Sequence, residues 1–249
     1  PPSAAGTDGI PYWLFRHPDV AQMLADLLNI AHSAGRLPAT MRISRVSLIH
    51  KRDDPSILTN YRPISITSTA YRIFGRVLTM RLNECLPQII PHHQTAYVPG
   101  RRITENIILA DVAQHFAKKP GGVGFLLSVD FEKAFDRMDH KFLQAILEAW
   151  GLGPWMVTAA GLPTVDAYAS ISIDGRLTPP VQVLAGIRQG CCVSPILFIL
   201  GLEAMLIAVQ VLPEVTPLAL PGHTVSISAY ADDANFFIAD LASVIHILR

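Results

Sequence analysis

The sequence is short of charge and of cysteine, and both shortages exclude classes of protein. Charged residues make up 16% of the 249 positions and hydrophobic residues 50%, which is typical of a packed globular protein and not of a disordered one. The three cysteines are Cys85 and the adjacent pair Cys191 and Cys192, and adjacent cysteines do not form an ordinary disulfide. With no CxxC and no histidine at zinc-ligand spacing from a cysteine, neither a disulfide framework nor a zinc site is expected.

Long apolar runs and nucleotide-binding signatures are scarce as well. No basic segment followed by an apolar one opens the chain, so no secretory signal is expected. Residues 196–212 are interrupted by Glu203 and Gln210 and fall short of the ~20 apolar residues that span a bilayer. We therefore expect no membrane contact and an intracellular location, nuclear or cytoplasmic. The absence of GxxxxGK[ST] and GxGxxG argues against an ATPase or a dinucleotide enzyme.

A formal net charge of zero at first argues against a nucleic-acid partner, but the charge is unevenly distributed. Residues 1–119 contain 14 Lys and Arg against 8 Asp and Glu, whereas residues 120–249 contain 6 against 12. A basic half suits contact with phosphates, and an acidic half suits binding of metal cations.

Hydrophobic periodicity predicts an α+β fold. Helices are expected at 19–33, 65–86, 104–118 and 140–150 and from 195 onward; strands are expected at 41–51, 124–131, 167–174, 181–184, 223–230 and 234–240. This order favours an antiparallel sheet with helices packed on one face. The sequence Lys-Pro-Gly-Gly at 119–122 is a strong break, and the charge changes sign there.

Three aspartates stand where strands are expected to end. Asp130 closes the apolar run 124–131, and Asp232 and Asp233 occupy the tip of the last predicted hairpin. Side-by-side carboxylates repel one another, and no cation stands nearby in the sequence to relieve them. Phosphoryl transfer by two metal ions uses such carboxylates as hard oxygen ligands, so the pattern indicates a divalent-metal site.

Six blocks, in order, resemble the reverse transcriptases of LINE-type, non-LTR retrotransposons. They are TDGIP at 7–11, NYRPIS at 60–65, QTAYVPGRRITENI at 94–107, VDFEKAFDRMDH at 129–140, GIRQGCCVSPILF at 186–198 and AYADD at 229–233. The resemblance implies the fingers and palm of a right-hand polymerase, with fingers at 1–120 and palm at 121–249. It also implies RNA-directed DNA synthesis from dNTPs on an RNA template and DNA primer, with two Mg²⁺ ions, or Mn²⁺ in their place.

The resemblance also implies roles for individual residues. Asp130, Asp232, Asp233 and the carbonyl of Phe131 would bind metal, and Phe135 would be the steric gate that excludes a 2′-hydroxyl. The remaining roles are a nucleotide loop (Gln189, Gly190), primer contacts (Tyr230, Ala231), triphosphate contacts (Lys51, Arg52, Arg62) and template contacts (Gln94, Gly100, Arg101, Arg102). Asp136 and Asp139 are expected only to solvate or cap the helix that follows them.

Other interpretations stay open. Cys192 and Val193 replace the family's usual Pro and Leu, a change expected to affect packing more than chemistry. The further palm segment, primer grip and thumb that follow this hairpin in the family, and which the rest of a retroelement polyprotein would supply, are not in the sequence. The chain alone is therefore expected to polymerise weakly or not at all. An intron maturase, retron or telomerase subunit is an alternative, and a decayed or domesticated copy that binds RNA without catalysis is another.

Overall fold

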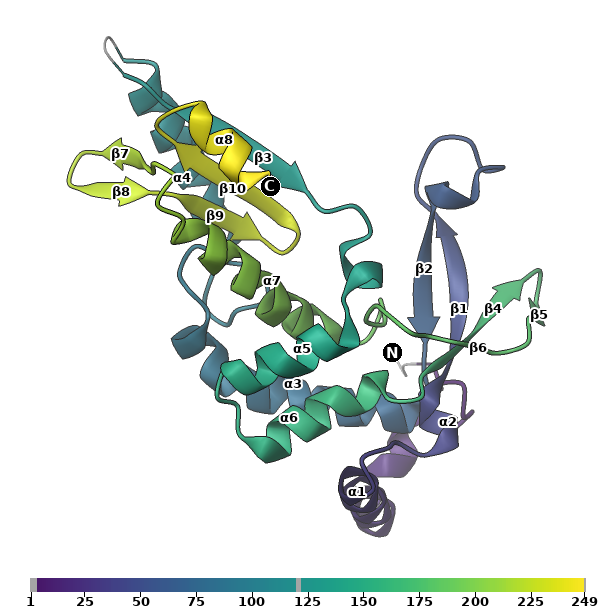
Figure 1. Cartoon of the computed structure of the whole chain (residues 1–249). Helices are drawn as coiled ribbons and strands as arrows, with labels where there is room; N and C mark the ends of the chain where they lie inside the picture. The colour runs from purple at the N-terminus through teal and green to yellow at the C-terminus, as the bar shows by residue number, and fades with distance from the viewer. Residues whose placement is uncertain (1–3, 120–121, 249) are drawn as a thin grey trace. The chain divides into compact units, whose positions relative to one another are not determined.

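A computed structural model describes residues 4–119 and 122–248, and the chain divides into two compact units (Figure 1). The first unit contains Pro1–Arg81 and Phe135–Leu197, and the second contains Leu82–Ala134 and Phe198–Arg249. Each unit therefore combines two separate segments of sequence. The expected boundary between fingers and palm, with the break at 119–122, includes residues 120 and 121, which lie outside the described residues. That boundary stays a prediction.

The first unit is built around a five-stranded sheet. Its strands are β1 (Ile43–His50), β2 (Tyr61–Ile66), β4 (Tyr168–Ile173), β5 (Arg176–Leu177) and β6 (Val181–Gln182). The order is β2-β1-β4-β5, with β6 also paired to β4. β1 pairs antiparallel with β2 and parallel with β4, so two hairpins far apart in sequence join along β1.

The first unit also contains helices. They are α1 (Pro18–Ser33), α2 (Ala39–Arg42), α5 (His140–Ala149) and α6 (Pro154–Gly161), and α3 (Thr69–Ile89) and α7 (Ser194–Gln210) contribute residues to both units. α5 begins where the Asp139 carboxylate accepts a hydrogen bond from Phe142 N at 2.7 Å, which confirms the predicted cap. Leu143 and Leu147, one turn apart, are its buried residues, because residues at i and i+4 share one face of a helix.

The second unit contains a three-stranded antiparallel sheet in the order β3-β10-β9 (Figure 1). The strands are β3 (Phe125–Asp130), β9 (Ile227–Tyr230) and β10 (Asp233–Ile238), next to a small hairpin of β7 (Leu218–Leu220) and β8 (His223–Val225) and the helices α4 (Ile103–Ala117) and α8 (Ala242–Ile247). Phe237 of β10 is 1% exposed and packs in a cluster with α4 and the β7–β8 hairpin. The antiparallel sheet and the α+β class are confirmed.

Three expectations about elements need correction. Residues 61–66 form β2, although the pattern placed 52–63 in a polar turn and began a helix at 65. The run 223–230 divides into β8 and β9. The apolar strand β3, expected to be buried, has Phe125 and Leu126 about two-fifths exposed at 41% and 40%. In residues 4–119 and 122–248, no helix combines the length and apolar character needed to cross a bilayer.

Candidate active site

The three predicted metal-binding aspartates all belong to the second unit. β3 and β10 pair antiparallel, with Asp130 directly opposite Asp233. Directly opposed residues project from the same face of a sheet with their Cβ atoms about 4.5–5.5 Å apart. The carboxylates of Asp130 and Asp233 are exposed, and that of Asp232 is half-buried. The fold thus brings together carboxylates that are about a hundred residues apart in sequence.

A tight turn joins β9 to β10. Tyr230 pairs with Asp233, so Ala231 and Asp232 are the two loop residues of the hairpin. Ala231 has φ +56°, a left-handed conformation that costs a residue with a Cβ about 1–2 kcal/mol and that hairpins usually assign to glycine. The side chain of Ala231 is buried, whereas Tyr230 is 37% exposed. Of the two predicted primer contacts, only Tyr230 offers side-chain surface.

Burial and charge repulsion within this group both act on Asp233. Burial raises the pKa of Asp233 above its ordinary value, and the charges of Asp232 and Asp130 raise it further. A divalent cation is the chemical group that would relieve this repulsion. Among the described residues, however, no three Asp, Glu, His or Cys side chains gather closely enough in this conformation to hold a metal ion. The donor types suit Mg²⁺, and binding would require the carboxylates to move together.

This repulsion leads to a stability prediction. Because like charges directly opposite one another destabilise a strand pair, Asp233→Asn should stabilise the metal-free chain at pH 7. Screening by solvent limits the gain to about 0.5 kcal/mol, or roughly 1–2 °C in Tm. We expect added Mg²⁺ to raise Tm for the native chain and to raise it less for the variant. Differential scanning fluorimetry in EDTA and in excess Mg²⁺ measures both effects.

An Asp233→Asn chain that melts at or below the native temperature in EDTA would contradict the repulsion. Asp174→Asn, on an exposed hairpin of the first unit, is the matched control.

The turn is held by a residue predicted to contact template. Gln94 is 0% exposed; its Oε1 accepts from Ala231 N at 3.0 Å and from Ala96 N at 3.1 Å, and its Nε2 donates to Ala231 O at 3.4 Å. A side chain so buried and bonded does not reach a template in this conformation. In this conformation Gln94 contacts the YADD turn, and the template contact expected for it stays a prediction.

Arg101 is also engaged inside the protein. Its guanidinium donates to the carbonyl oxygens of Pro87, Ile90, Pro91 and Gln94 at 2.5–3.3 Å. These carbonyls lie at the end of α3 and in the loop after it, where backbone acceptors lack helical partners. Burial lowers the pKa of Arg101, although at neutral pH an arginine remains charged. Arg101 therefore has a structural role in this conformation, and the template contact expected for it stays a prediction.

Two other predicted template residues remain at the surface. Gly100 has φ +83° and is exposed, so glycine suits the backbone there. Arg102 is exposed at the start of α4, where its backbone N–H donates to Glu105 Oε1 at 3.1 Å. A guanidinium with part of its surface open to solvent can contact phosphate, and the template role of Arg102 stays a prediction.

The predicted nucleotide residues of the first unit are brought together by a loop. Residues 186–190 bond to the turn that contains Phe135, with Ile187 N donating to Phe135 O at 2.8 Å and Gly186 N donating to Met138 O at 2.7 Å. Ser65 N of β2 donates to Gln189 O at 2.8 Å. Phe135 itself is half-buried in the 3₁₀ helix Ala134–Arg137. Phe135, Gln189 and Gly190 therefore belong to one bonded assembly.

Close backbone approach explains two glycines of this loop. Gly186 has φ +86°, and a Cβ there would lie 2.7 Å from Asp136 O. Gly190 has φ +99°, and its Cβ would lie 3.1 Å from Ser65 O. Any larger residue would push the loop away from the Phe135 turn and from β2.

The adjacent cysteines follow this loop and pack against α3. A Cβ at Gly75 would lie 3.2 Å from Cys192 Sγ and 3.4 Å from Cys191 Sγ, so glycine makes room for both sulfur atoms. A hydrogen bond with Cys192 lowers the pKa of Cys191 to about 6. The space beside Gly75 accommodates Cys192, which stands where the family usually has proline.

The predicted triphosphate cations lie on the β1–β2 hairpin and its loop. Lys51 and Arg52 follow β1 directly and are exposed. Arg62 lies within β2, opposite Ile49, and is also exposed; the sequence had placed it in a loop. Exposed cations on one hairpin suit contact with phosphate, and their roles stay predictions.

Sequence reasoning missed three polar residues of these assemblies. Asp136, expected to face solvent or cap a helix, accepts a hydrogen bond from Gln189 Nε2 at 3.1 Å. Asn106 donates to Ser228 Oγ at 2.8 Å and to Ala229 O at 2.9 Å, which fixes α4 to β9. Arg188 is 8% exposed, stacks 4.8 Å from the Tyr71 ring centroid and donates to the carbonyls of Met41 and Arg42. Asn106 and Arg188 lie within the sequence blocks 94–107 and 186–198 that resemble the family, and this position could have indicated their importance.

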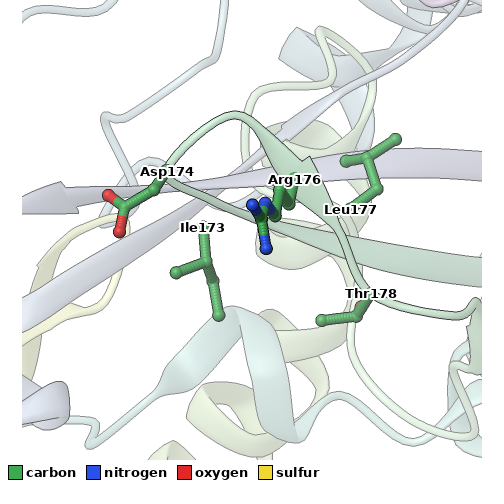
Figure 2. A pocket seen from close by; sticks show the side chains of 5 residues that line it. All are labelled: Ile173, Asp174, Arg176, Leu177 and Thr178. Atoms are coloured by element: carbon green, nitrogen blue, oxygen red, sulfur yellow. The ribbon is translucent and has the colours of Figure 1, made fainter.

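An open hollow of about 480 Å³ lies on the β4–β5 hairpin. Figure 2 shows its lining side chains, with the Asp174 carboxylate directed away from Arg176. Ile173 and Leu177 are more than half exposed there. None of the predicted site residues lines this hollow, and we assign it no role.

The fold is that of the fingers and palm of a right-hand polymerase, and solved telomerase structures share it. Apo telomerase from Candida tropicalis matches with a TM-score of 0.58 at 11% identity, over 93% of this chain and 46% of its own. Telomerase from Candida albicans in complex with a TWJ fragment of telomeric RNA matches with a TM-score of 0.56 at 13% identity, over 96% and 43%. At such identities the likeness concerns the fold alone.

The chain belongs to the reverse transcriptase family. The family model described as reverse transcriptase (RNA-dependent DNA polymerase) matches residues 49–249. The transposon TX1 uncharacterized 149 kDa protein of Xenopus laevis is 35% identical over 94% of this chain and 18% of its own length. The Pol polyprotein of the type-2 retrotransposable element R2DM of Drosophila melanogaster is 26% identical over 94% and 22%. The chain thus spans about a fifth of these relatives, and the expected non-LTR retrotransposon family is confirmed.

Proposed function

We propose that the chain is the catalytic part of an RNA-directed DNA polymerase, which transfers a dNMP unit from a dNTP to a primer 3′-hydroxyl and releases pyrophosphate. The observation that carries this proposal is the placement of Asp130 opposite Asp233, with Asp232 at the adjoining turn, in a member of the reverse transcriptase family. Retrotransposon Pol polyproteins among the relatives support RNA as the template. The remainder of such a polyprotein would be a partner in the intact protein.

The carboxylates of Asp130, Asp232 and Asp233, with the carbonyl of Phe131, would hold two Mg²⁺ ions, with Mn²⁺ as the alternative. Bound divalent ions supply charge neutralisation at the phosphates and acidify the attacking hydroxyl. The raised pKa of Asp233 and the opposition of like charges support this assignment. The chain's own contribution is to present these oxygens from paired strands, which limits their freedom to move.

The residues of the first unit would select and hold the nucleotide. The half-buried ring of Phe135 would contact the sugar and exclude a 2′-hydroxyl, while Gln189 and Gly190 would contact the base. Lys51, Arg52 and Arg62 would hold the triphosphate, and Gly100 and Arg102 of the second unit would contact the template. Tyr230 would contact the primer. The Asp136 contact to Gln189 Nε2 supports a fixed orientation for that amide.

Primer extension tests the proposal directly. With an RNA template, a DNA primer and dNTPs, extension should require Mg²⁺ or Mn²⁺ and stop in EDTA. We expect Phe135→Val to lower the preference for dNTP over NTP by at least about tenfold, because a smaller side chain leaves space for the 2′-hydroxyl. The measurement is kcat/KM for a matched dNTP and NTP pair, on this chain and on the full-length gene product.

Phe142→Val is the control, because Phe142 is an exposed aromatic residue of α5 at 44%. Its nucleotide preference should match that of the native protein. Binding of RNA without extension under any metal condition would favour a non-catalytic RNA-binding copy instead. An unchanged preference in the Phe135→Val variant would remove the steric-gate role and leave the polymerase proposal standing.

A further inference from the structure

Gln94 engages both backbone polar groups of the left-handed residue in the YADD turn. Its Oε1 accepts from Ala231 N and its Nε2 donates to Ala231 O, at 3.0 and 3.4 Å. These contacts join residues 137 positions apart in the sequence. Because Gln94 and Ala231 are both buried, water does not compete freely for these polar groups. Loss of the hydrogen bonds would leave the N–H and C=O of Ala231 unsatisfied.

The loop that carries Gln94 is itself fixed along β9. Ala229 N donates to His93 O at 2.7 Å, and Thr95 N donates to Ala229 O at 3.0 Å. Residues 93–95 therefore run beside β9 in a parallel bridge. The Thr95 hydroxyl bonds to Asn106 Oδ1, which reinforces the same loop. Gln94 thus acts from a rigid support and not from a mobile segment.

Ala231 needs such a support because its conformation is unfavourable. At φ +56° an alanine is strained by about 1–2 kcal/mol relative to its usual conformations. Relaxation of Ala231 to negative φ would change the direction of the next residue, Asp232. A side chain that bonds both the N–H and the C=O of Ala231 opposes that relaxation.

We propose that Gln94 is a positioning residue, which holds Ala231 in its left-handed conformation and thereby sets the direction of the Asp232 carboxylate for metal binding. This inference rests on the proposed function, because it assigns a purpose to the geometry of the metal-binding turn. A purely structural Gln94 would stabilise the fold equally without affecting the metal site. A glycine at position 231 distinguishes the positioning role from a purely structural one, because glycine adopts positive φ without strain. The hydrogen bonds from Gln94 to residue 231 should then be less necessary.

The test compares four variants with the native protein: Gln94→Met, Ala231→Gly, the combination of both, and Thr95→Val. Gln94→Met keeps the length of the side chain and removes its hydrogen bonds. Thr95→Val is the matched control, because Thr95 is buried in the same loop and its hydroxyl bonds to Asn106 and Ala229. Mn²⁺ binding is measured by electron paramagnetic resonance on the chain, and kcat and KM for dNTP are measured on the full-length gene product.

We expect Gln94→Met to weaken Mn²⁺ binding about 10–100-fold, as loss of a group that orients a ligand does, and to lower kcat with KM for dNTP unchanged. The double variant should bind Mn²⁺ within about threefold of Ala231→Gly alone, since glycine removes the strain that Gln94 opposes. Thr95→Val should lower Tm while leaving Mn²⁺ affinity near the native value.

Each result decides between the alternatives. If the native chain binds no Mn²⁺, the metal site of the proposed function fails, and the role of Gln94 fails with it. If the native chain binds Mn²⁺ and Gln94→Met binds it equally well, or Ala231→Gly gives no rescue, the positioning role alone is overturned. Should Gln94→Met fail to fold, Gln94→Asn takes its place, because its shorter amide cannot span both groups of Ala231; native Mn²⁺ affinity in a folded Gln94→Asn chain likewise overturns the role.

Discussion

Asp232→Asn is expected to lower the rate of dNTP incorporation about a thousandfold or more, because loss of several kcal/mol of charge stabilisation at the phosphates corresponds to ~10³ in rate. Asn has nearly the shape of Asp and removes only the charge, so the hairpin should keep its pairing of Tyr230 with Asp233. Single-turnover primer extension with saturating template-primer measures the rate of the chemical step. The same variant should bind Mn²⁺ more weakly while retaining template-primer, since the template contacts belong to other residues.

Asp174→Asn is the control for this experiment. Asp174 also lies at a hairpin tip, with φ +46°, and asparagine accepts that conformation. Incorporation by the Asp174→Asn protein should equal that of the native protein. If Asp232→Asn retained more than a tenth of native activity, Asp232 would not be a metal ligand, and the carboxylate assignment would have to move to Asp130 and Asp233 alone.

Arg101→Ala is expected to produce the largest loss of stability among the predicted site residues. The guanidinium donates to four carbonyl oxygens at the end of α3 and in its following loop. Charged hydrogen bonds of this kind are worth about 1.5–3 kcal/mol, and a partly exposed site lets water replace some of them. We expect a loss of about 2–3 kcal/mol in the free energy of unfolding, which corresponds to roughly 5–10 °C in Tm. Thermal and urea unfolding monitored by circular dichroism measure it.

Arg102→Ala separates stability from nucleic-acid contact at the neighbouring position. Because Arg102 is exposed, removal of its side chain should change stability by no more than about 0.5 kcal/mol. It should instead weaken RNA binding and reduce the salt slope by about one. Arg101→Lys should remain unstable, since an ammonium cannot reproduce the planar fork of a guanidinium. If the Arg101→Ala chain melted normally and lost RNA affinity, the original template role of Arg101 would be restored.

Local sequence pattern predicted most of the elements because their periodicity is strong. The helix expected at 140–150 is α5, and the strand expected at 41–51 contains β1. The failures have physical causes. Tyr-Arg-Pro-Ile-Ser-Ile at 61–66 contains a proline, which argues against a strand. In the strand order β2 stands at the end, next to β1, and a sheet edge tolerates proline. The parallel pairing of β1 with β4 joins segments more than a hundred residues apart, and no local pattern indicates it.

The candidate site was predictable as a set of residues but not as a set of contacts. The pairing of Asp130 with Asp233 places the expected carboxylates together, although their metal-binding role stays a prediction. The resemblance to non-LTR reverse transcriptases assigned Gln94 and Arg101 to the template, whereas in the structure their side chains bond to backbone groups. The burial of Gln94 and the backbone contacts of Arg101 depend on β9 and on the end of α3, which the sequence of the loop alone does not specify. The identity of a glutamine or an arginine in the sequence does not show whether its side chain faces solvent or bonds to backbone groups.

The left-handed turn at Ala231 affects how copies of a retroelement should be compared. The side chain that bonds to Ala231 N and O belongs to Gln94, 137 residues earlier in the chain. On the role proposed for Gln94, a copy can keep all four residues of YADD and still lose the shape of the turn through one substitution at Gln94. A genomic survey that counts intact catalytic motifs would score such a copy as competent, and including the codon for Gln94 would correct the count.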